Sequence, residues 1–348
     1  MLINRLNYLI KNKIIQEEKP MLEYGERRLT YRVFLDVLSC LTYKGNFEVS
    51  SKVTHVHYKT DNPLITLLMF YHYTSKGKVY LMLPDDIENT LDMFASDSAL
   101  LIEGHDNLIY SLIDSCSVDK NKVEVSKSKE EDKVVSIDEY DDSIFHSKLD
   151  DLFLRAYSSG TSGMRKQVER SYRSWFDAFD IQNAIFGISS DTVAYIKGDI
   201  NYTGNLNYIL GVIHVGGTII ISSKRGVKDM IDYIKTAKIN NAFLVPTVLG
   251  VLARYINRSS SSVDYGENNI TLVTAGEKLQ EFVYKELKLK LKNSRIIEYY
   301  GASEVGHISY SIDDEILIGS GYVGKPFTGV NIKILKDKIY TNSPYHAI

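Results

Sequence analysis

The sequence has few cysteines, no long apolar run and no excess of charge of either sign. Two cysteines, Cys40 and Cys116, cannot form the disulfide framework of a small secreted protein, so a reducing, cytoplasmic location is expected. No apolar run approaches the roughly 18 residues that span a bilayer, so no membrane span is predicted. With 41 basic and 44 acidic side chains the formal charge is −3, which argues against a dedicated nucleic-acid-binding protein.

The 348 residues suffice for two or three lobes, and the order of apolar patterns predicts an α/β architecture. In residues 1–150, helical patterns that begin after Thr30 and at Pro63 alternate with short apolar strands. Helices and strands alternate again in residues 151–305, which predicts a second doubly wound lobe. From residue 306 to 348 the apolar residues alternate with period two, which predicts a small antiparallel β unit.

The run "YSSGTSGMRK" at residues 157–166 has little apolar surface to bury and contains many groups that can bind anions. Glycine permits backbone angles that point successive N–H groups into one concavity, and hydroxyl and ammonium groups add donors suited to phosphate. The residues concerned are Ser158, Ser159, Gly160, Thr161, Ser162, Gly163 and Lys166. A solvated linker is the alternative, but an apolar strand precedes the run and an amphipathic stretch follows it. This context favours a strand–loop–helix element that wraps a phosphate.

A second informative run, "EYYGASEVGH", occupies residues 298–307. Here a strand ends in aromatic residues and is followed by a glycine turn, a hydroxyl and a carboxylate. At the carboxyl end of an α/β sheet, Tyr300 could stack on a base and Glu304 could hold Mg²⁺. The alternative is a strand-end turn in which Glu304 caps a helix, and this run taken alone favours that alternative.

The match to the dinucleotide fingerprint G-x-G-x-x-G at residues 319–324 lacks the structural context that the fingerprint needs. Pro326 and an alternating strand-like stretch follow it, where a Rossmann loop would open into a helix. Dinucleotide binding is therefore not predicted.

Taken together and in this order, the two runs resemble motifs of the adenylate-forming superfamily of acyl-CoA synthetases, peptide synthetase adenylation domains and luciferases. Residues 157–166 match the phosphate loop of that superfamily, [YF]-[ST]-S-G-T-[ST]-G-x-P-K, except that Arg165 replaces the proline. The later motif Y-G-x-[ST]-E is met at residues 300–304. "TAGEKL" at residues 274–279 resembles x-G-G-E-x-L, and "GYVGKPFTGVNIKI" resembles the opening of the family's β-barrel lobe.

The resemblance implies an AMP-forming acid–thiol ligase. A carboxylic acid would react with ATP and Mg²⁺ to give an acyl-adenylate, and the thiol of CoA or of a carrier-protein phosphopantetheine would then take the acyl group. Lys166, Ser303 and Glu304 are the implied catalytic residues, and Glu304 is the implied metal ligand. The implied nucleotide-binding residues are Ser158, Ser159, Gly160, Thr161, Ser162, Gly163, Lys166, Gly276, Glu277, Tyr300, Gly301 and Ser303. Tyr202, Thr203 and Ala275 are the implied substrate-pocket residues.

Three departures from the family pattern leave an alternative open. Arg165 replaces a proline that would stiffen the loop, and Tyr202 stands where the family has a histidine. The sequence ends at Ile348 within the expected barrel lobe, so the implied ribose-binding aspartate, hinge and mobile C-terminal domain with its catalytic lysine are absent. A non-catalytic nucleotide- or acyl-binding protein of the same fold is therefore the alternative. The absence of the F-D-x-S motif of amino-acid adenylation domains favours a fatty or aromatic acid as substrate.

Overall fold

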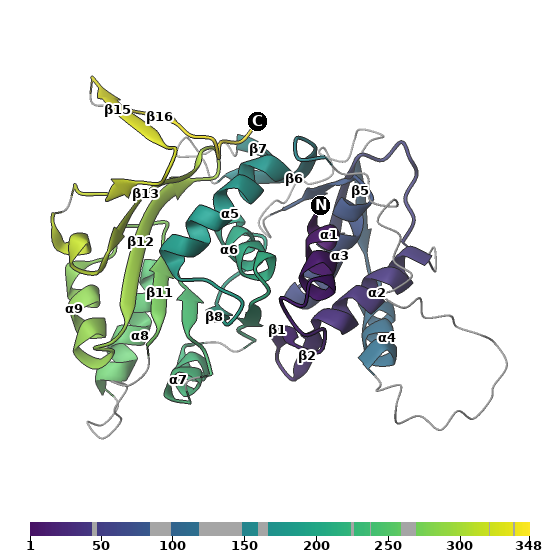
Figure 1. Ribbon diagram of the computed structural model, residues 1–348, viewed down its shortest axis with the longest axis horizontal. Coiled ribbons are helices and arrows are strands. Elements are labelled where there is room, and N and C mark those ends of the chain that lie inside the picture. The colour runs from purple at the N-terminus through teal and green to yellow at the C-terminus, as the bar shows by residue number, and fades with distance from the viewer. Residues whose placement is uncertain are drawn as a thin grey trace.

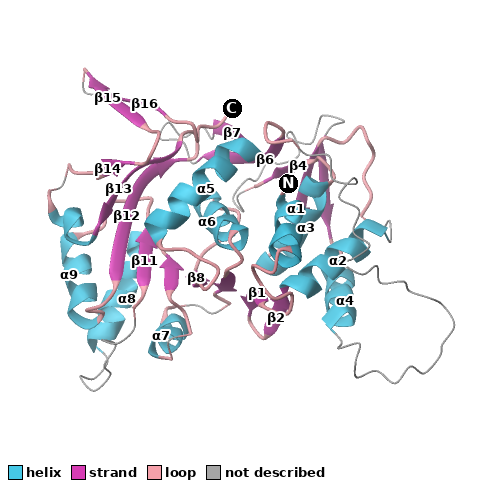
Figure 2. Ribbon diagram, in the orientation of Figure 1, coloured by secondary structure: helices cyan, strands magenta, loops and turns pink. Residues whose placement is uncertain are grey.

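The computed structural model describes residues 1–43, 47–83, 99–117, 148–158, 166–223, 226–236, 238–258, 269–319, 321–336 and 338–348. Within these ranges, helices and strands alternate and form two mainly parallel sheets that lie side by side (Figures 1 and 2). The predicted α/β class with two wound lobes is confirmed.

The smaller sheet has five strands in the order β5-β3-β4-β6-β7. Its strands are β3 (His55–Lys59), β4 (Val79–Leu81), β5 (Ala99–Glu103), β6 (Leu152–Ser158) and β7 (Lys166–Ser171). β3 pairs parallel with β4 and β5, and β4 pairs parallel with β6, whereas β6 and β7 are antiparallel. Helices α2 (Tyr31–Tyr43), α3 (Pro63–Ser75) and α4 (Asp106–Ser117) accompany this sheet.

The helix starts predicted at Thr30 and Pro63 are confirmed. The Thr30 hydroxyl accepts a hydrogen bond from the Val33 amide at 3.2 Å, which caps α2. Asn62 caps α3 in the same way through Leu64 at 2.9 Å, and Pro63 takes the first helical position, where no amide hydrogen is needed. Every residue of α3 from Leu64 to Ser75 is buried, as the largely apolar sequence predicts.

The larger sheet has nine strands in the order β14-β13-β12-β11-β10-β8-β9-β1-β2. These strands are β1 (Pro20–Tyr24), β2 (Arg27–Thr30), β8 (Val193–Ile196), β9 (Thr218–Ile221), β10 (Asn241–Phe243), β11 (Thr271–Thr274), β12 (Arg295–Ala302), β13 (Gly306–Ile312) and β14 (Lys325–Pro326). All pairings from β1 to β12 within this order are parallel, so the carboxyl ends of six strands share one edge. At the two sides of the sheet the pairing is antiparallel: β2 pairs with β1, β13 with β12, and β14 with β13.

Successive residues of the larger sheet face two different apolar cores. Ala194 and Ile196 of β8 join the core that contains α1 (Leu2–Lys11), α3, α5 (Tyr172–Phe186) and α6 (Thr203–His214). Tyr195 points the other way, into a core with α7 (Lys228–Lys235), α8 (Pro246–Arg258) and α9 (Glu281–Lys290). The first core also contains β3, β4 and β6, so it joins the two sheets into one body.

The two sheets interleave along the chain. β1 and β2, in the predicted first lobe, belong to the larger sheet, and β6 and β7, in the predicted second lobe, belong to the smaller one. The predicted boundary at residue 150 therefore does not coincide with a boundary between the sheets. The division of the chain into domains at residues 150 and 305 stays a prediction.

The C-terminal β unit differs from the prediction in its pairing. β13 and β14 extend the larger sheet, and only the hairpin β15 (Asn331–Leu335) and β16 (Lys338–Asn342) stands apart from it. A short 3-10 helix at Asp313–Leu317 lies between β13 and β14 along the chain. The described residues thus contain no closed barrel. Among them, no helix is both long and apolar enough to cross a membrane.

Candidate active site

Two paired antiparallel strands, β6 and β7, flank the predicted phosphate loop in the sequence. Ser158 is the last residue of β6 and pairs with Lys166, the first residue of β7, so the predicted strand–loop–helix element is in fact strand–loop–strand, followed by α5. Within the hairpin, the Arg155 guanidinium on β6 donates two hydrogen bonds to the Glu169 carboxylate on β7, at 2.8 and 2.5 Å. Lys166 is exposed at the mouth of the hairpin. The predicted residues Ser159, Gly160, Thr161, Ser162 and Gly163 lie outside the described residues.

A first cavity of about 240 Å³ opens where β11 and β12 end. Predicted nucleotide residues from both strand ends line it, namely Gly276, Glu277, Tyr300 and Gly301. The Tyr300 ring is 43% exposed and is therefore available to stack on a ligand. Lys278 also lines the cavity and forms an ion pair of 2.5 Å with Glu298.

A second, smaller cavity of about 70 Å³ adjoins the first. It is lined by all three predicted substrate-pocket residues and by predicted nucleotide residues, namely Tyr202, Thr203, Ala275, Gly276, Gly301 and Ser303. Gly276 and Gly301 line both cavities, so the two spaces share a wall. The structure thus brings together residues that span a hundred positions of sequence.

Both shared glycines are required by the backbone. Gly276 has a φ of +104°, which residues with a side chain rarely adopt. At Gly301, a Cβ would lie 2.5 Å from the carbonyl oxygen of Gly306 on the neighbouring strand, at an irregularity in the pairing of β12 with β13. Because neither glycine has a side chain, the ends of β11 and β12 can lie close together while the space between them stays open.

Ser303 and Glu304 occupy the turn between β12 and β13. The Ser303 hydroxyl lies 3.0 Å from the hydroxyl of Thr203, at the start of α6. Glu304 is exposed, and its carbonyl oxygen accepts a hydrogen bond from Ala347 at 2.7 Å. β13 follows this turn directly, so the alternative in which Glu304 caps a helix is wrong.

Arg170 is a buried cation beside this turn that the sequence analysis missed. Its side chain lines the smaller cavity and is only 2% exposed. One guanidinium nitrogen donates to the Ser303 carbonyl at 2.5 Å and the other to the Tyr345 carbonyl. Burial lowers the pKa of Arg170 to about 10, and the nearby charge of Glu304 partly opposes that shift. The sequence carries no signal for this role, because "KQVERS" is typical of a solvated strand.

His307 lines the same cavity as a neutral side chain. Burial, together with the positive charge of Arg170, lowers its pKa to about 3. Trp175 and Tyr345 complete the apolar part of the wall. The cavity therefore combines one buried cation, hydroxyl groups and aromatic rings.

No cluster of three or more histidine, cysteine, aspartate or glutamate side chains exists among the described residues. A magnesium ion that is shared with phosphates would need only one or two protein carboxylates. Glu304, exposed beside Ser303, can supply one such carboxylate.

Comparisons with known proteins agree with this geometry. The sequence model of the family described as AMP-binding enzyme matches residues 91–342, so the chain belongs to that family. It is 24% identical over 337 residues, 96% of its length, to the "Putative long chain fatty acid-CoA ligase VraA" of Staphylococcus haemolyticus. It is also 24% identical over 182 residues, 52% of its length, to the "Uncharacterized acyl--CoA ligase YhfT" of Bacillus subtilis. The alignments span 65% of the first relative and 36% of the second.

Solved structures share the fold at low sequence identity. The crystal structure of VinN superposes with a TM-score of 0.75 at 15% identity, covering 100% of this chain and 89% of VinN. The o-succinylbenzoate CoA synthetase MenE of Bacillus subtilis, in complex with AMP, superposes with a TM-score of 0.73 at 16% identity, covering 98% of this chain and 70% of MenE. The predicted resemblance to adenylate-forming enzymes is confirmed at the level of family and fold.

Proposed function

We propose that the protein activates a carboxylic acid as an acyl-adenylate, with the adenosine part of ATP in the larger cavity and the acid in the smaller one. The observation that carries this proposal is the wall that the two cavities share at Gly276 and Gly301. An acyl-adenylate joins an acyl group to a nucleotide through one phosphate, and the arrangement matches that shape. Membership of the AMP-binding family and relatives named as CoA ligases support the assignment.

The reaction is a displacement at the α-phosphorus of ATP. A carboxylate oxygen forms the new bond to phosphorus, the bond to the β-phosphate oxygen breaks, and pyrophosphate leaves with the electron pair. Such a step depends on positioning and on neutralising charge more than on acid–base chemistry. Ser303, whose hydroxyl lies 3.0 Å from that of Thr203, lines the smaller cavity and can donate a hydrogen bond to the α-phosphate.

The remaining roles follow the resemblance. Lys166, exposed at the end of the hairpin, and the hydroxyls and glycines of the preceding loop would hold the β- and γ-phosphates. Tyr300 would stack on adenine, and Glu277 would line the nucleotide pocket. Glu304 would hold Mg²⁺, which when bound neutralises phosphate charge. The acceptor thiol of CoA or of a carrier protein, and a cytoplasmic location, belong to the same proposal.

The size of the smaller cavity bears on the choice of acid. A cavity of roughly 150 Å³ holds benzene in other proteins, and the smaller cavity here measures about 70 Å³. A short acid or the carboxyl end of a longer one therefore fits as the cavity stands. A fatty acid, which the name of one relative suggests, would have to extend past these walls.

The alternative is a non-catalytic nucleotide- or acyl-binding protein of the same fold. Tyr202, which lies against both Gly204 and Gly276 where the family has a histidine, favours this alternative. The two functions differ in one observable, which is whether the acid undergoes chemistry with ATP.

The test is acid-dependent exchange of labelled pyrophosphate into ATP, with acids from acetate to palmitate and aryl acids such as benzoate. Exchange that requires both Mg²⁺ and one class of acid, and that Lys166→Ala abolishes, supports the ligase. Tight nucleotide binding with no exchange for any acid supports the binding protein. The exposed Lys333→Ala on β15 is the matched control.

A further inference from the structure

Arg170 is a buried charge without a carboxylate at ion-pair distance among the described residues. Its two hydrogen-bond acceptors are the backbone carbonyls of Ser303 and Tyr345, both of which are uncharged. Glu304 affects it only through the field of its exposed carboxylate. A buried, unneutralised cation is costly in free energy unless another group compensates it.

The position of this cation points to what compensates it. Arg170 and Ser303 both line the smaller cavity, which shares Gly276 and Gly301 with the larger cavity proposed for the nucleotide. A guanidinium presents five N–H donors in a planar fork, so donors remain after two of them bond to carbonyls. Carboxylates and phosphates match that fork best.

We propose that Arg170 is an anion-binding residue of this cavity, which recognises either the carboxylate of the acid or the α-phosphate of the nucleotide. This inference rests on the proposed function. Arg170 lies on β7, the strand after the phosphate loop, four residues beyond Lys166, and would add a second cation to the site.

The test separates charge recognition from structural support. Binding of AMP is compared with binding of adenosine, and binding of butyrate and benzoate with that of butyramide and benzamide, by calorimetry. Each amide keeps the shape of its acid without the negative charge, and adenosine lacks the phosphate of AMP. The proteins are the wild type, Arg170→Met, Arg170→Lys and the control Arg173→Met, whose native side chain is exposed and paired with Asp150.

In the wild type, at least one anionic ligand should bind more tightly than its neutral partner. Arg170→Met should reduce that preference by about tenfold or more, the scale of a charged hydrogen bond, while binding of the neutral partner stays unchanged. Arg170→Lys should retain part of the preference, and Arg173→Met all of it. The pair that responds identifies the anion: AMP against adenosine for phosphate, acid against amide for carboxylate.

Three results would overturn the inference, and they are distinguishable. If the wild type binds anionic ligands preferentially and Arg170→Met leaves the preference intact, Arg170 only supports the fold. If the wild type binds no nucleotide and no acid, the proposed function fails together with this inference. A general loss of binding of both neutral and anionic ligands, with a lowered melting temperature, would likewise show a purely structural role.

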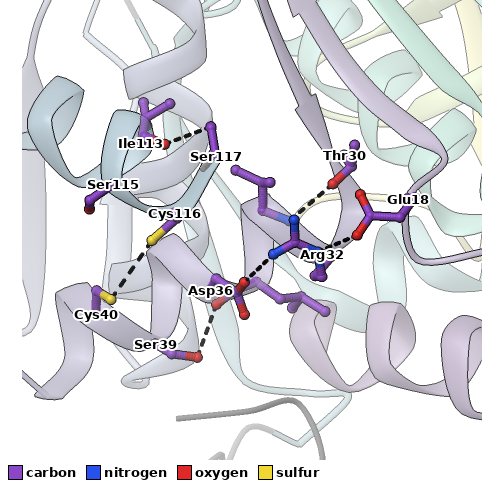
Figure 3. A network of polar contacts seen from close by, with 12 residues as sticks. Glu18, Thr30, Arg32, Asp36, Ser39, Cys40, Ile113, Ser115, Cys116 and Ser117 are labelled. Atoms are coloured by element: carbon purple, nitrogen blue, oxygen red, sulfur yellow. Dashed lines mark hydrogen bonds and ion pairs between the residues drawn. The ribbon is translucent and has the colours of Figure 1, made fainter. Parts of the chain in front are cut away.

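A separate observation concerns the two cysteines of the chain. Cys40 lies in the last turn of α2, Cys116 lies at the end of α4, and their sulfur atoms face each other at 3.9 Å (Figure 3). Cys116 is buried, whereas Cys40 is partly exposed and is therefore the more accessible residue of the pair. A disulfide needs the two sulfurs at about 2 Å, so the pair must approach by roughly a further 2 Å.

The geometry points to an oxidation site, in which hydrogen peroxide converts Cys40 and Cys116 into a disulfide that ties α2 to α4. The Cys40 sulfur attacks peroxide, the O–O bond breaks, one water leaves, and a sulfenic acid remains on Cys40. The Cys116 sulfur then attacks the Cys40 sulfur, the S–O bond breaks, and a second water leaves. Two thiols are thereby oxidised to one disulfide and one peroxide is reduced to two waters.

Mass spectrometry of the peroxide-treated protein tests this site. The expected product has lost two hydrogen atoms, remains monomeric, and melts at a higher temperature because the link closes a loop between residues 76 positions apart. Dithiothreitol should reverse the change, and Cys40→Ser and Cys116→Ser should each prevent it. Sulfinic acid on Cys40 without a disulfide, or covalent dimers in place of the internal link, would overturn the proposal.

Discussion

The hydroxyl groups of Thr203 and Ser303 lie 3.0 Å apart, although the residues are 100 positions apart in the sequence. One begins α6 and the other follows β12, and both line the smaller cavity. This contact fixes the position of the Ser303 hydroxyl in the wall of the smaller cavity. We expect it to orient that hydroxyl toward the α-phosphate.

A double-mutant cycle tests this contact. Thr203→Val and Ser303→Ala should each slow acid-dependent pyrophosphate exchange, and the double variant should slow it by less than the product of the single effects. The expected coupling is about 1 kcal/mol, the usual net value of a hydrogen bond. Strictly multiplicative effects would mean that the two hydroxyls act independently.

Removal of the Lys166 ammonium should weaken ATP binding. The side chain is exposed at the end of the β6–β7 hairpin, so Lys166→Ala should leave the fold intact. The expected loss is about 1.5–3 kcal/mol of binding free energy, the scale of a hydrogen bond to a charged group. Calorimetry with ATP measures it, and equal affinity in the wild type and the variant would refute the assigned role.

Loss of the Glu304 charge should remove the effect of magnesium. Glu304→Gln preserves the shape of an exposed side chain in the β12–β13 turn, so the melting temperature should hardly change. ATP binding measured with and without Mg²⁺ should then become the same. A large loss of stability with magnesium dependence intact would show that Glu304 has a structural role.

Buried histidines should make the fold sensitive to acid. Burial lowers the pKa of His307 and His72 to about 3 and that of His214 to about 4. In the unfolded chain each would titrate at about 6.5, so the unfolded state binds more protons below that pH. The stabilising contribution is therefore complete above pH 6.5 and decreases as the pH falls toward 4, by up to about 1.4 kcal/mol per pH unit for each histidine.

Urea unfolding at several pH values between 7.5 and 4.5 measures this dependence. His72→Leu should make the slope of unfolding free energy against pH less steep, because His72 is fully buried and the variant has no group to protonate there. The exposed His105→Gln is the control and should leave the slope unchanged. An identical slope in His72→Leu would contradict the assignment of a buried neutral histidine.

The sequence predicts most helices, strands and strand-end site residues, because these depend on local patterns. The cap at Thr30, the uniformly buried helix after Pro63 and the glycine turns after β11 and β12 are of this kind. The pairing of β1 with β9 could not be predicted in this way, since it depends on packing between segments nearly 200 residues apart. Arg170 was missed for the same reason, because only the turn at Ser303 and the chain at Tyr345 give that cation its place.

We propose that the two adjoining cavities together hold one acyl-adenylate. The most direct test of this proposal is calorimetric binding of a stable acyl-sulfamoyladenosine, which joins an acyl group to adenosine through a phosphate mimic, compared with binding of AMP and of the free acid. Because one molecule would fill both spaces, we predict that at least one acyl derivative binds about tenfold or more tightly than AMP, a gain of about 1.4 kcal/mol. If every acyl derivative binds no more tightly than AMP, the smaller cavity does not hold the acyl group and the account is contradicted.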